Sequence, residues 1–363
     1  MERSDIHRVP ATWLDEHAGV AIRTRLARDV LDDPARAPDV DELLAFKSVA
    51  QILRKQKPDG TWGGNILGIA ADKTMGVRGP GTVFHYRRLL ELGLPADARP
   101  LALSNRVFFR LLSRDPDPKL AFEYGRIGKG NPSVLEWGRA LMQEGAAAAL
   151  AQAGHRMDPR LRGAAQRILG AVSNFLRSEH VEEPIIKHGS RNILHPDAHP
   201  PTLFSVAMIS YLPTLQRERA GLMDRMVAFL NYPAPHRHYT VELGKAHLEP
   251  TFHILGDPLT LDAAGRPKDL PFALHWMEIL ARLGVLDQVE SAMRIFESLR
   301  ADCNDEGVWA PRSLRSLPKN PSGLTEFCFP LEADTKTAAG RRADVTFRLA
   351  LIASLAGLQL EVV

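Results

Sequence analysis

The sequence predicts an all-α protein in which helical hairpins close into a double ring, an (α/α)6 toroid. Three observations support this fold class. Helical periodicity rich in Ala, Leu and Arg runs through the chain, and the period-2 alternation typical of strands is nearly absent. Apolar helices alternate with charged amphipathic ones, as an inner and an outer ring require. Two turns between helices share a pattern of aspartate, glycine and tryptophan.

Apolar helices, predicted for the inner ring, open in similar ways along the chain. Proline is favoured in a first helical turn because its missing N–H is not needed there. The segment Ala11–Val30 has the place and length of a sixth inner helix. The other five are predicted to start near Pro80, Pro132, Pro201, Pro271 and Ala343.

Charged amphipathic helices lie between the apolar ones and are predicted to form the outer ring. One face of each is apolar and the other charged, which suits a helix with a solvent side. We expect a single domain over residues 1–363, with a long Pro/His-rich loop at about 231–270. The predicted outer helices are Val40–Gln56, Ala98–Ser113, Pro159–Ser178, Gln216–Asn231 and Leu286–Arg300.

The turn Pro58–Trp62 combines a tight reversal with a large aromatic side chain. The Asp59-Gly60 pair permits the reversal because glycine tolerates a positive φ. We expect the indole of Trp62 to lie across the end of a neighbouring helix and to donate its N–H to a terminal carbonyl. The same is expected at Asp305–Trp309, so both tryptophans are predicted to staple hairpins together.

Composition excludes several classes of protein. A net charge of +3 over 363 residues is too mild for a nucleic-acid-binding surface. No apolar run reaches the roughly 18 residues of a membrane span, and the charged N-terminal segment lacks the apolar core of a signal peptide. Cys303 and Cys328 do not make a disulfide framework. A cytoplasmic protein is expected; peripheral membrane contact and the oligomeric state are left open.

Gln56, Asp59, Gly60 and Trp62 follow a helix that ends ILRKQ, and together they resemble the QW repeat of the prenyltransferase/squalene-oxidase superfamily. This superfamily includes terpene cyclases and the β subunits of protein prenyltransferases. Asp305–Trp309, followed by the helix DVTFRLALIASLAG, resembles a second and degraded copy. The resemblance implies the α-toroid fold of these squalene-cyclase-like proteins, with a ligand in a central cavity.

The activity motifs of that superfamily are missing. No Asp-x-Asp-Asp of class II cyclases occurs, and Asp39–Glu42 is interpreted as the start of a helix. Asp32-Asp33 runs into Pro34-Ala35, so the Asp-Asp-x-x-Asp of class I synthases is absent too. The turn Asp305–Gly307 has no cysteine and the helix after it no histidine, so no zinc site of the prenyltransferase kind is expected. No cofactor is predicted.

Polar residues early in the inner helices are the candidates for a site in a central cavity. A buried Glu136 or Asp344 is predicted to donate a proton, with His275 tuning it. Tryptophan and phenylalanine faces at the same places would stabilise a carbocation. The alternative is that Glu136–Arg139 and Asp344–Arg348 are structural pairs. The predicted ligand-binding residues are His85, Tyr86, Trp137, Arg139, Trp276, Glu278, Phe347 and Arg348.

Histidines cluster in the Pro-rich loop. His236-x-His238 and His247-x-Glu249-x-x-x-His253 have spacings that a metal could use. Loops of this length are often lids or partner surfaces. Alternatives stay open among a metal site, a solvated loop and a lid whose Arg237, Lys245, Arg266 and Lys268 meet an anion such as a diphosphate.

The sequence therefore predicts a protein that binds an apolar, isoprenoid-like small molecule, with acid-assisted chemistry as a further step. One alternative is a non-catalytic scaffold that binds a partner through its outer ring or its histidine-rich loop. A second alternative is a carbohydrate-active (α/α)6 enzyme, which needs facing carboxylates or a His/Tyr/Arg set. Whether the protein is an enzyme is left open at this point.

Overall fold

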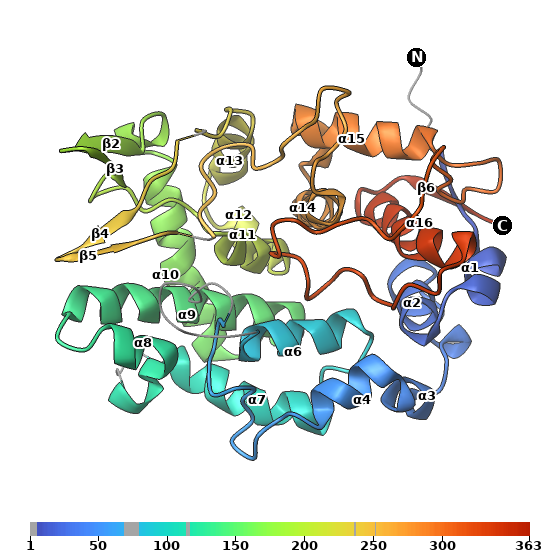
Figure 1. Ribbon diagram of the computed structural model, residues 1–363, viewed down its shortest axis with the longest axis horizontal. Coiled ribbons are helices and arrows are strands. Elements are labelled where there is room, and N and C mark those ends of the chain that lie inside the picture. Colours follow the sequence, from blue (N-terminus) through green and yellow to red (C-terminus); the bar gives the residue numbers. More distant parts are fainter. Residues whose placement is uncertain (1–5, 69–79, 114–116, 236, 251) are drawn as a thin grey trace. The chain divides into compact units, whose positions relative to one another are not determined.

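The computed structural model describes residues 6–68, 80–113, 117–235, 237–250 and 252–363, and most of them are helical (Figure 1). The chain divides into two compact units. Unit 1 comprises residues 1–54, 88–95 and 259–363, and unit 2 comprises residues 55–87 and 96–258. Each unit has its own buried apolar core.

Unit 1 is built around two helices that pack on each other, α14 (Leu270–Leu283), which is almost wholly buried, and α16 (Ala338–Leu355), which is buried from Ala343 to Ala353. Asp269 caps the start of α14 by accepting the N–H of Phe272, and Gly284 ends that helix in a left-handed conformation. The other helices of the unit are α1 (Ala11–His17), α2 (Val20–Arg25), the π-helix η1 (Leu26–Val30), η2 (Pro34–Arg36), α3 (Val40–Ala45), α4 (Lys47–Leu53), η6 (Leu286–Gln288) and α15 (Glu290–Ala301).

Two short strands of unit 1 join distant parts of the chain. β1 (Ile6–Val9) pairs in parallel with β6 (Gln359–Val362), and both contact α16 (Figure 1). A parallel pair needs a long connection between its strands. Here most of the sequence lies between them.

Unit 2 is organised around α9 (Pro132–Gln152), which packs against several other helices of the unit. The run Ala146–Ala151 is fully buried, and these small side chains permit close approach of α11 (Leu203–Ser210). The other helices of the unit are α7 (Arg99–Leu111), η4 (Pro118–Ala121), α8 (Phe122–Ile127), α10 (Pro159–Phe175), η5 (Glu179–Val181), α12 (Pro213–Arg217) and α13 (Leu222–Leu230). Helix α6 (Thr82–Glu91) begins in unit 2 and ends in unit 1.

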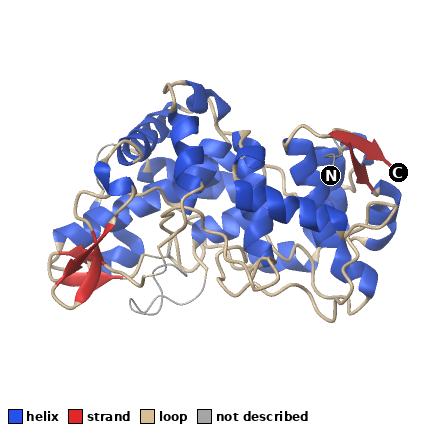
Figure 2. Cartoon of the chain, turned by 90° about the horizontal axis from the view of Figure 1, so that it is seen from above, coloured by secondary structure: helices blue, strands red, loops and turns tan. Residues whose placement is uncertain are grey.

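Two β-hairpins in unit 2 lie side by side (Figure 2). β2 (Ile185–His188) pairs with β3 (Arg191–Leu194), and β4 (Val241–Leu243) pairs with β5 (Ala246–Leu248). A bridge from Ile193 to Thr240 connects them. The protein is helix-rich as predicted, but the sequence missed these strands. Each has only three or four residues, which is too few for a period-2 pattern to stand out.

The predicted apolar helices are confirmed as helices, with shifted starts. α9 begins at Pro132 as predicted, whereas α6 and α11 begin two residues late, at Thr82 and Leu203. The start of α11 moves because Thr202 forms a reciprocal cap with Ser205. α14 begins at Leu270, and α16 begins at Ala338, five residues before the predicted Ala343.

Four predicted helices are broken into shorter ones, while Ala98–Ser113 and Pro159–Ser178 are each confirmed as a single helix. The predicted Leu286–Arg300 is divided into η6 and α15 at Val289, whose backbone is extended. The predicted Val40–Gln56 is interrupted at Phe46, whose backbone is extended. The predicted Gln216–Asn231 is interrupted at Gly221, which is left-handed with φ +63°. Ala11–Val30 is likewise divided among α1, α2 and η1. The closed ring that these helices would form remains a prediction.

The first tryptophan turn forms as the sequence suggests. Gly60 has φ +86°, and its N–H donates to the carbonyl of Lys57 over 2.9 Å. The N–H of Lys57 donates in turn to the carbonyl of Thr61 over 2.9 Å. The backbone N–H of Trp62 then donates to the hydroxyl of Thr82, at the start of α6, over 3.1 Å.

The second turn, in unit 1, repeats this geometry. Gly307 has φ +87°, and its N–H donates to the carbonyl of Asn304 over 2.9 Å. The N–H of Asn304 donates to the carbonyl of Val308, again over 2.9 Å. The backbone N–H of Trp309 donates to the hydroxyl of Thr346, in α16, over 3.1 Å. The two turns are therefore structural copies, as their sequences predicted.

The bonding of these turns to helices differs from the prediction. The side-chain amide of Gln56 donates to the carbonyl of Pro100 over 2.8 Å, and the hydroxyl of Ser104 donates to the carbonyl of Gly60 over 2.6 Å. The indole N–H of Trp309 is buried and has no acceptor among the described residues, so the predicted indole bond is wrong there. Gln56 and Ser104 bond the first turn to a helix, and the backbone of each turn bonds to a threonine hydroxyl, while the indole of Trp309 is buried without such a bond.

Candidate functional site

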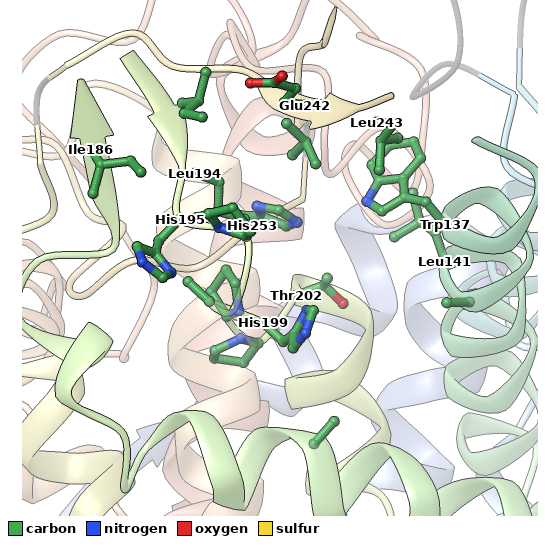
Figure 3. A pocket seen from close by; sticks show the side chains of 18 of the residues that line it. Trp137, Leu141, Ile186, Leu194, His195, His199, Thr202, Glu242, Leu243 and His253 are labelled. Atoms are coloured by element: carbon green, nitrogen blue, oxygen red, sulfur yellow. The ribbon is translucent and has the colours of Figure 1, made fainter. Parts of the chain in front are cut away.

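A cavity of about 630 Å³ lies within unit 2, between the helices and the two hairpins (Figure 3). Helix α9 contributes Trp137, Leu141 and Glu144 to one wall, and α10 contributes Val172. Ligand-binding pockets commonly have volumes of roughly 300–1,000 Å³. This cavity is therefore large enough for a small organic molecule.

Apolar side chains make up much of the cavity wall, and charged groups of the hairpins border it. Lys187, His188 and Glu242 come from the hairpin strands, and the imidazole of His188 lies 2.8 Å from the carboxylate of Glu242. Figure 3 shows Glu242 on its strand at the top of the view and Thr202 lower down, with His195 and His253 at a height between them. The apolar lining includes Ile186, Ile193, Leu194, Pro196, Pro200, Pro201, Val241 and Leu243.

Glu144 is a half-buried acid in the wall of this cavity. The hydroxyl of Thr202, the cap residue of α11, donates a short hydrogen bond to its carboxyl group. Burial raises the pKa of Glu144 to about 7, and the bond from Thr202 opposes this shift without cancelling it. A carboxyl group with this pKa exchanges a proton near neutral pH, which suits a general acid or base.

Histidines form the other polar part of the cavity. His195, His199 and His253 all line it (Figure 3). Burial and, to a smaller extent, the neighbouring His199 lower the pKa of His253 to about 4. The ring of His253 also stacks on that of Tyr239, at a centroid distance of 6.4 Å. His253 is therefore neutral near pH 7 and has a nitrogen that can accept a proton.

The raised pKa of Glu144 predicts a pH-dependent stability. Because the folded state holds the proton more tightly than the unfolded state, this contribution is fully present below about pH 4.5 and is lost as the pH rises through about 7. A shift of this size corresponds to about 3 kcal/mol. We expect the free energy of unfolding of the wild type to fall between pH 5 and pH 8 relative to that of Glu144→Gln, whose side chain does not titrate.

Urea unfolding of both proteins at pH 5, 6, 7 and 8 measures this difference. The subtraction removes the titration of all groups that the two proteins share. A constant difference across the range would show that Glu144 is ionised in the folded protein at pH 5 and would contradict its raised pKa.

The predicted site residues on α9 have different surroundings. Trp137 lines the cavity, as a ligand-binding residue should, and its ring meets that of Tyr124 edge-on at 6.0 Å. Glu136 is exposed, so it lacks the burial on which its prediction as a proton donor depended. Arg139 is half-buried and does not line the cavity. The described structure shows no ion pair between Glu136 and Arg139.

Two further predicted residues of unit 2 lie on α6. His85 is half-buried against Trp62, at a ring distance of 5.6 Å, and burial lowers its pKa to about 4. Tyr86 is fully buried, and its hydroxyl donates to the side-chain carbonyl of Asn105 over 2.7 Å. Neither lines the cavity. Their proposed ligand contacts stay predictions.

The remaining predicted residues belong to unit 1 and lie in its core. Arg348 and Asp344 are bonded over 3.0 Å, which confirms the structural pair that the sequence offered as an alternative. The guanidinium of Arg348 also lies 3.5 Å from the carboxylate of Glu278. His275, Trp276 and Phe347 are fully buried in the same unit.

A buried charge network surrounds Arg348. Glu91 lies 3.5 Å from Arg348 and accepts a hydrogen bond from Arg25 over 2.5 Å. Burial would raise the pKa of Glu278, but Arg282 and then Arg25 hold it below its ordinary value. Burial raises the pKa of Asp344 despite its arginine partner. The predicted acid Asp344 thus has the expected direction of shift, inside an ion-pair network.

The basic residues and histidines expected to form a lid are distributed over both units. Arg237 and Lys245 are exposed in unit 2, and Arg266 and Lys268 are exposed in unit 1. Position 236 lies outside the described residues. Of the histidines in this loop, His253 lines the cavity and His238 pairs with Glu249 over 3.0 Å. The loop therefore supplies one wall of the cavity through its hairpin and His253.

Sequence reasoning missed Glu144 and Thr202. A weak signal for Glu144 was present, since it is the one acid in the apolar stretch GRALMQEGAAAALAQ. Its partner is 58 residues away, so no local pattern joins the two.

Comparisons with protein-family models, with curated proteins and with solved structures find no match for this chain. Among the described residues, no helix is both long enough and apolar enough to cross a membrane.

Proposed function

We propose that unit 2 binds an apolar, isoprenoid-like small molecule in its cavity and that Glu144 donates a proton to it. The observation that supports this most is a half-buried carboxyl group with a raised pKa, bonded to Thr202, in a cavity whose wall is largely apolar. The resemblance of the two tryptophan turns to the repeats of terpene cyclases supports the choice of an isoprenoid.

The chemistry uses groups that line the cavity. The proton of the Glu144 carboxyl group passes to a carbon–carbon double bond of the ligand, which leaves a carboxylate and a carbocation. The hydroxyl of Thr202 already donates to this carboxyl group, and its bond strengthens when the charge appears. The face of Trp137 stabilises the cation, and neutral His253 accepts the proton that the cation later releases.

Binding and turnover with farnesol as the probe test the proposal. We expect farnesol to quench tryptophan fluorescence in the wild type and in Glu144→Gln alike, because the amide keeps the shape of the acid. Turnover should fall at least about 100-fold in Glu144→Gln, since a positioned acid contributes about that much or more. Asp224→Asn, an exposed carboxyl group of α13 in the same unit, is the matched control and should change neither measurement.

Two results would overturn the proposal. One is that neither native mass spectrometry of the purified protein nor the fluorescence titration detects an apolar ligand. The other is that Glu144→Gln keeps full turnover while Glu136→Gln loses it. That outcome would make Glu136, the residue predicted from the sequence, the proton donor.

A second candidate function is cleavage of a glycosidic bond, which the presence of Glu242 in the same cavity favours. Glycosidases use two carboxyl groups, one as acid and the other as base or nucleophile. Glu242→Gln separates the two functions. It should abolish turnover of a glycoside but leave the protonation of an isoprenoid by Glu144 in place.

A further inference from the structure

We propose that His180, His195 and Asp197 of unit 2 bind a divalent transition-metal ion of the zinc type. One possible ligand atom from each of these side chains lies within 4.8 Å of the others. In the part of the chain that the structure describes, this is the one such group of three. The acid chemistry proposed for Glu144 does not use it.

The local fold holds the two imidazoles against each other. His180 lies in the short helix η5, and His195 directly follows strand β3. The backbone N–H of His195 donates to the carbonyl of Pro184 over 2.8 Å, and this bond holds the backbone of His195 in place. The two rings stack with centroids 4.0 Å apart and planes inclined by 22°.

The Nδ1 atom of His195 faces the third ligand. It lies 4.0 Å from a carboxylate oxygen of Asp197 and accepts the backbone N–H of that residue over 3.1 Å. This nitrogen has a single in-plane lone pair, so a metal ion that binds it takes the place of that N–H. Zinc bonds to imidazole nitrogen at about 2.0–2.1 Å and to carboxylate oxygen at about 2.0–2.2 Å. A closure of less than about 1 Å therefore brings this nitrogen and oxygen to tetrahedral spacing.

The charges of the cluster also fit a bound cation. A divalent ion binds both rings in their neutral form, and the carboxylate of Asp197 offsets part of its charge. Two nitrogens and one oxygen suit zinc and its neighbours better than calcium or magnesium, which prefer oxygen ligands.

The number and position of the ligands favour an open site. Structural zinc sites are usually closed by four protein ligands, whereas sites with three leave a position for water or a ligand molecule. His195 also lines the cavity of unit 2, so an ion on its ring borders that cavity. The half-buried histidines and the exposed Asp197 leave a path for the ion from solvent.

Calorimetric titration of the EDTA-treated full chain with zinc sulfate tests this site. We expect one ion per chain, and a loss of affinity of at least about 10- to 100-fold in His180→Ala, His195→Ala and Asp197→Asn, since even outer-sphere changes have effects of that size. His238→Ala is the matched control, because His238 is exposed and also contacts a carboxylate. It should bind zinc as the wild type does.

A cobalt titration and a thermal melt make the result independent of activity. Cobalt in the site should give the visible absorption bands of a four-coordinate ion, and zinc should raise the Tm of the wild type but not of His195→Ala. Glu144→Gln should bind zinc with unchanged affinity. The metal-site proposal and the proposed role of Glu144 as an acid can therefore be tested independently of each other. Absence of stoichiometric binding, or unchanged affinity in His195→Ala protein that is folded by circular dichroism, would overturn the inference.

Discussion

Replacement of Arg348 by methionine is expected to lower the free energy of unfolding of unit 1 by about 3–5 kcal/mol. The side chain of Arg348 is 1% exposed and lies against three carboxyl groups, those of Glu91, Glu278 and Asp344. Methionine keeps much of the volume but removes the positive charge. The carboxylates then remain buried without their common partner, and this uncompensated charge causes most of the loss.

Urea unfolding followed by circular dichroism measures the change. Arg36→Met is the matched control, because Arg36 pairs with Asp15 in the same unit. The two side chains of this pair are 35% and 37% exposed. Exposed pairs contribute only about 0–1 kcal/mol. A loss below about 1 kcal/mol in Arg348→Met would show that water reaches the network and screens its charges.

Truncation of either turn tryptophan to alanine is expected to cost about 3–5 kcal/mol in its own unit. Trp62 is 1% exposed and Trp309 is 4% exposed, so each substitution leaves a large cavity under a turn. The backbone bonds to Thr82 and Thr346 do not involve the indole and should survive. The structural equivalence of the two turns predicts that the two losses are of similar size.

Hydrogen exchange resolves the effect by unit. Trp62→Ala should increase exchange in α6 and α7, and Trp309→Ala should increase it in α15 and α16. Trp13→Ala is the control, since Trp13 is half-buried and stacks on His17 near the surface. If Trp62→Ala or Trp309→Ala is no less stable than the control, the indole does not hold the turn in place.

Helices could be predicted from the sequence wherever neighbouring residues, such as a cap or a proline in the first turn, set the start of the helix. Pro132 at the first position of α9, with Asn131 as its cap, is such a case. Phe46 shows the limit, because no local signal announces its extended backbone between α3 and α4. The tryptophan turns were predictable in detail, since glycine with positive φ and the short backbone bonds around it are local features.

The candidate site was less predictable because its contacts are distant in sequence. Trp137 was selected as a polar-tipped aromatic residue early in an apolar helix, and it does line the cavity. Glu136, one residue earlier, satisfied the same rule but is exposed. Successive side chains of a helix are rotated by about 100° around its axis. A prediction that is wrong by one or two positions therefore selects an exposed acid in place of one that lines the cavity. The acid Glu144 lies two turns further on.

During synthesis on the ribosome, unit 1 is completed late, because its last segment begins at residue 259. Its buried charge network joins Arg25 and Glu91 to Glu278 and Arg348, which emerge only after all of unit 2 has been made. Unit 2 ends at residue 258, so all of its residues are made before the last segment of unit 1. Until the last third of the chain is made, Arg25 and Glu91 are exposed to water. They become buried when the segment with Glu278 and Arg348 packs on them.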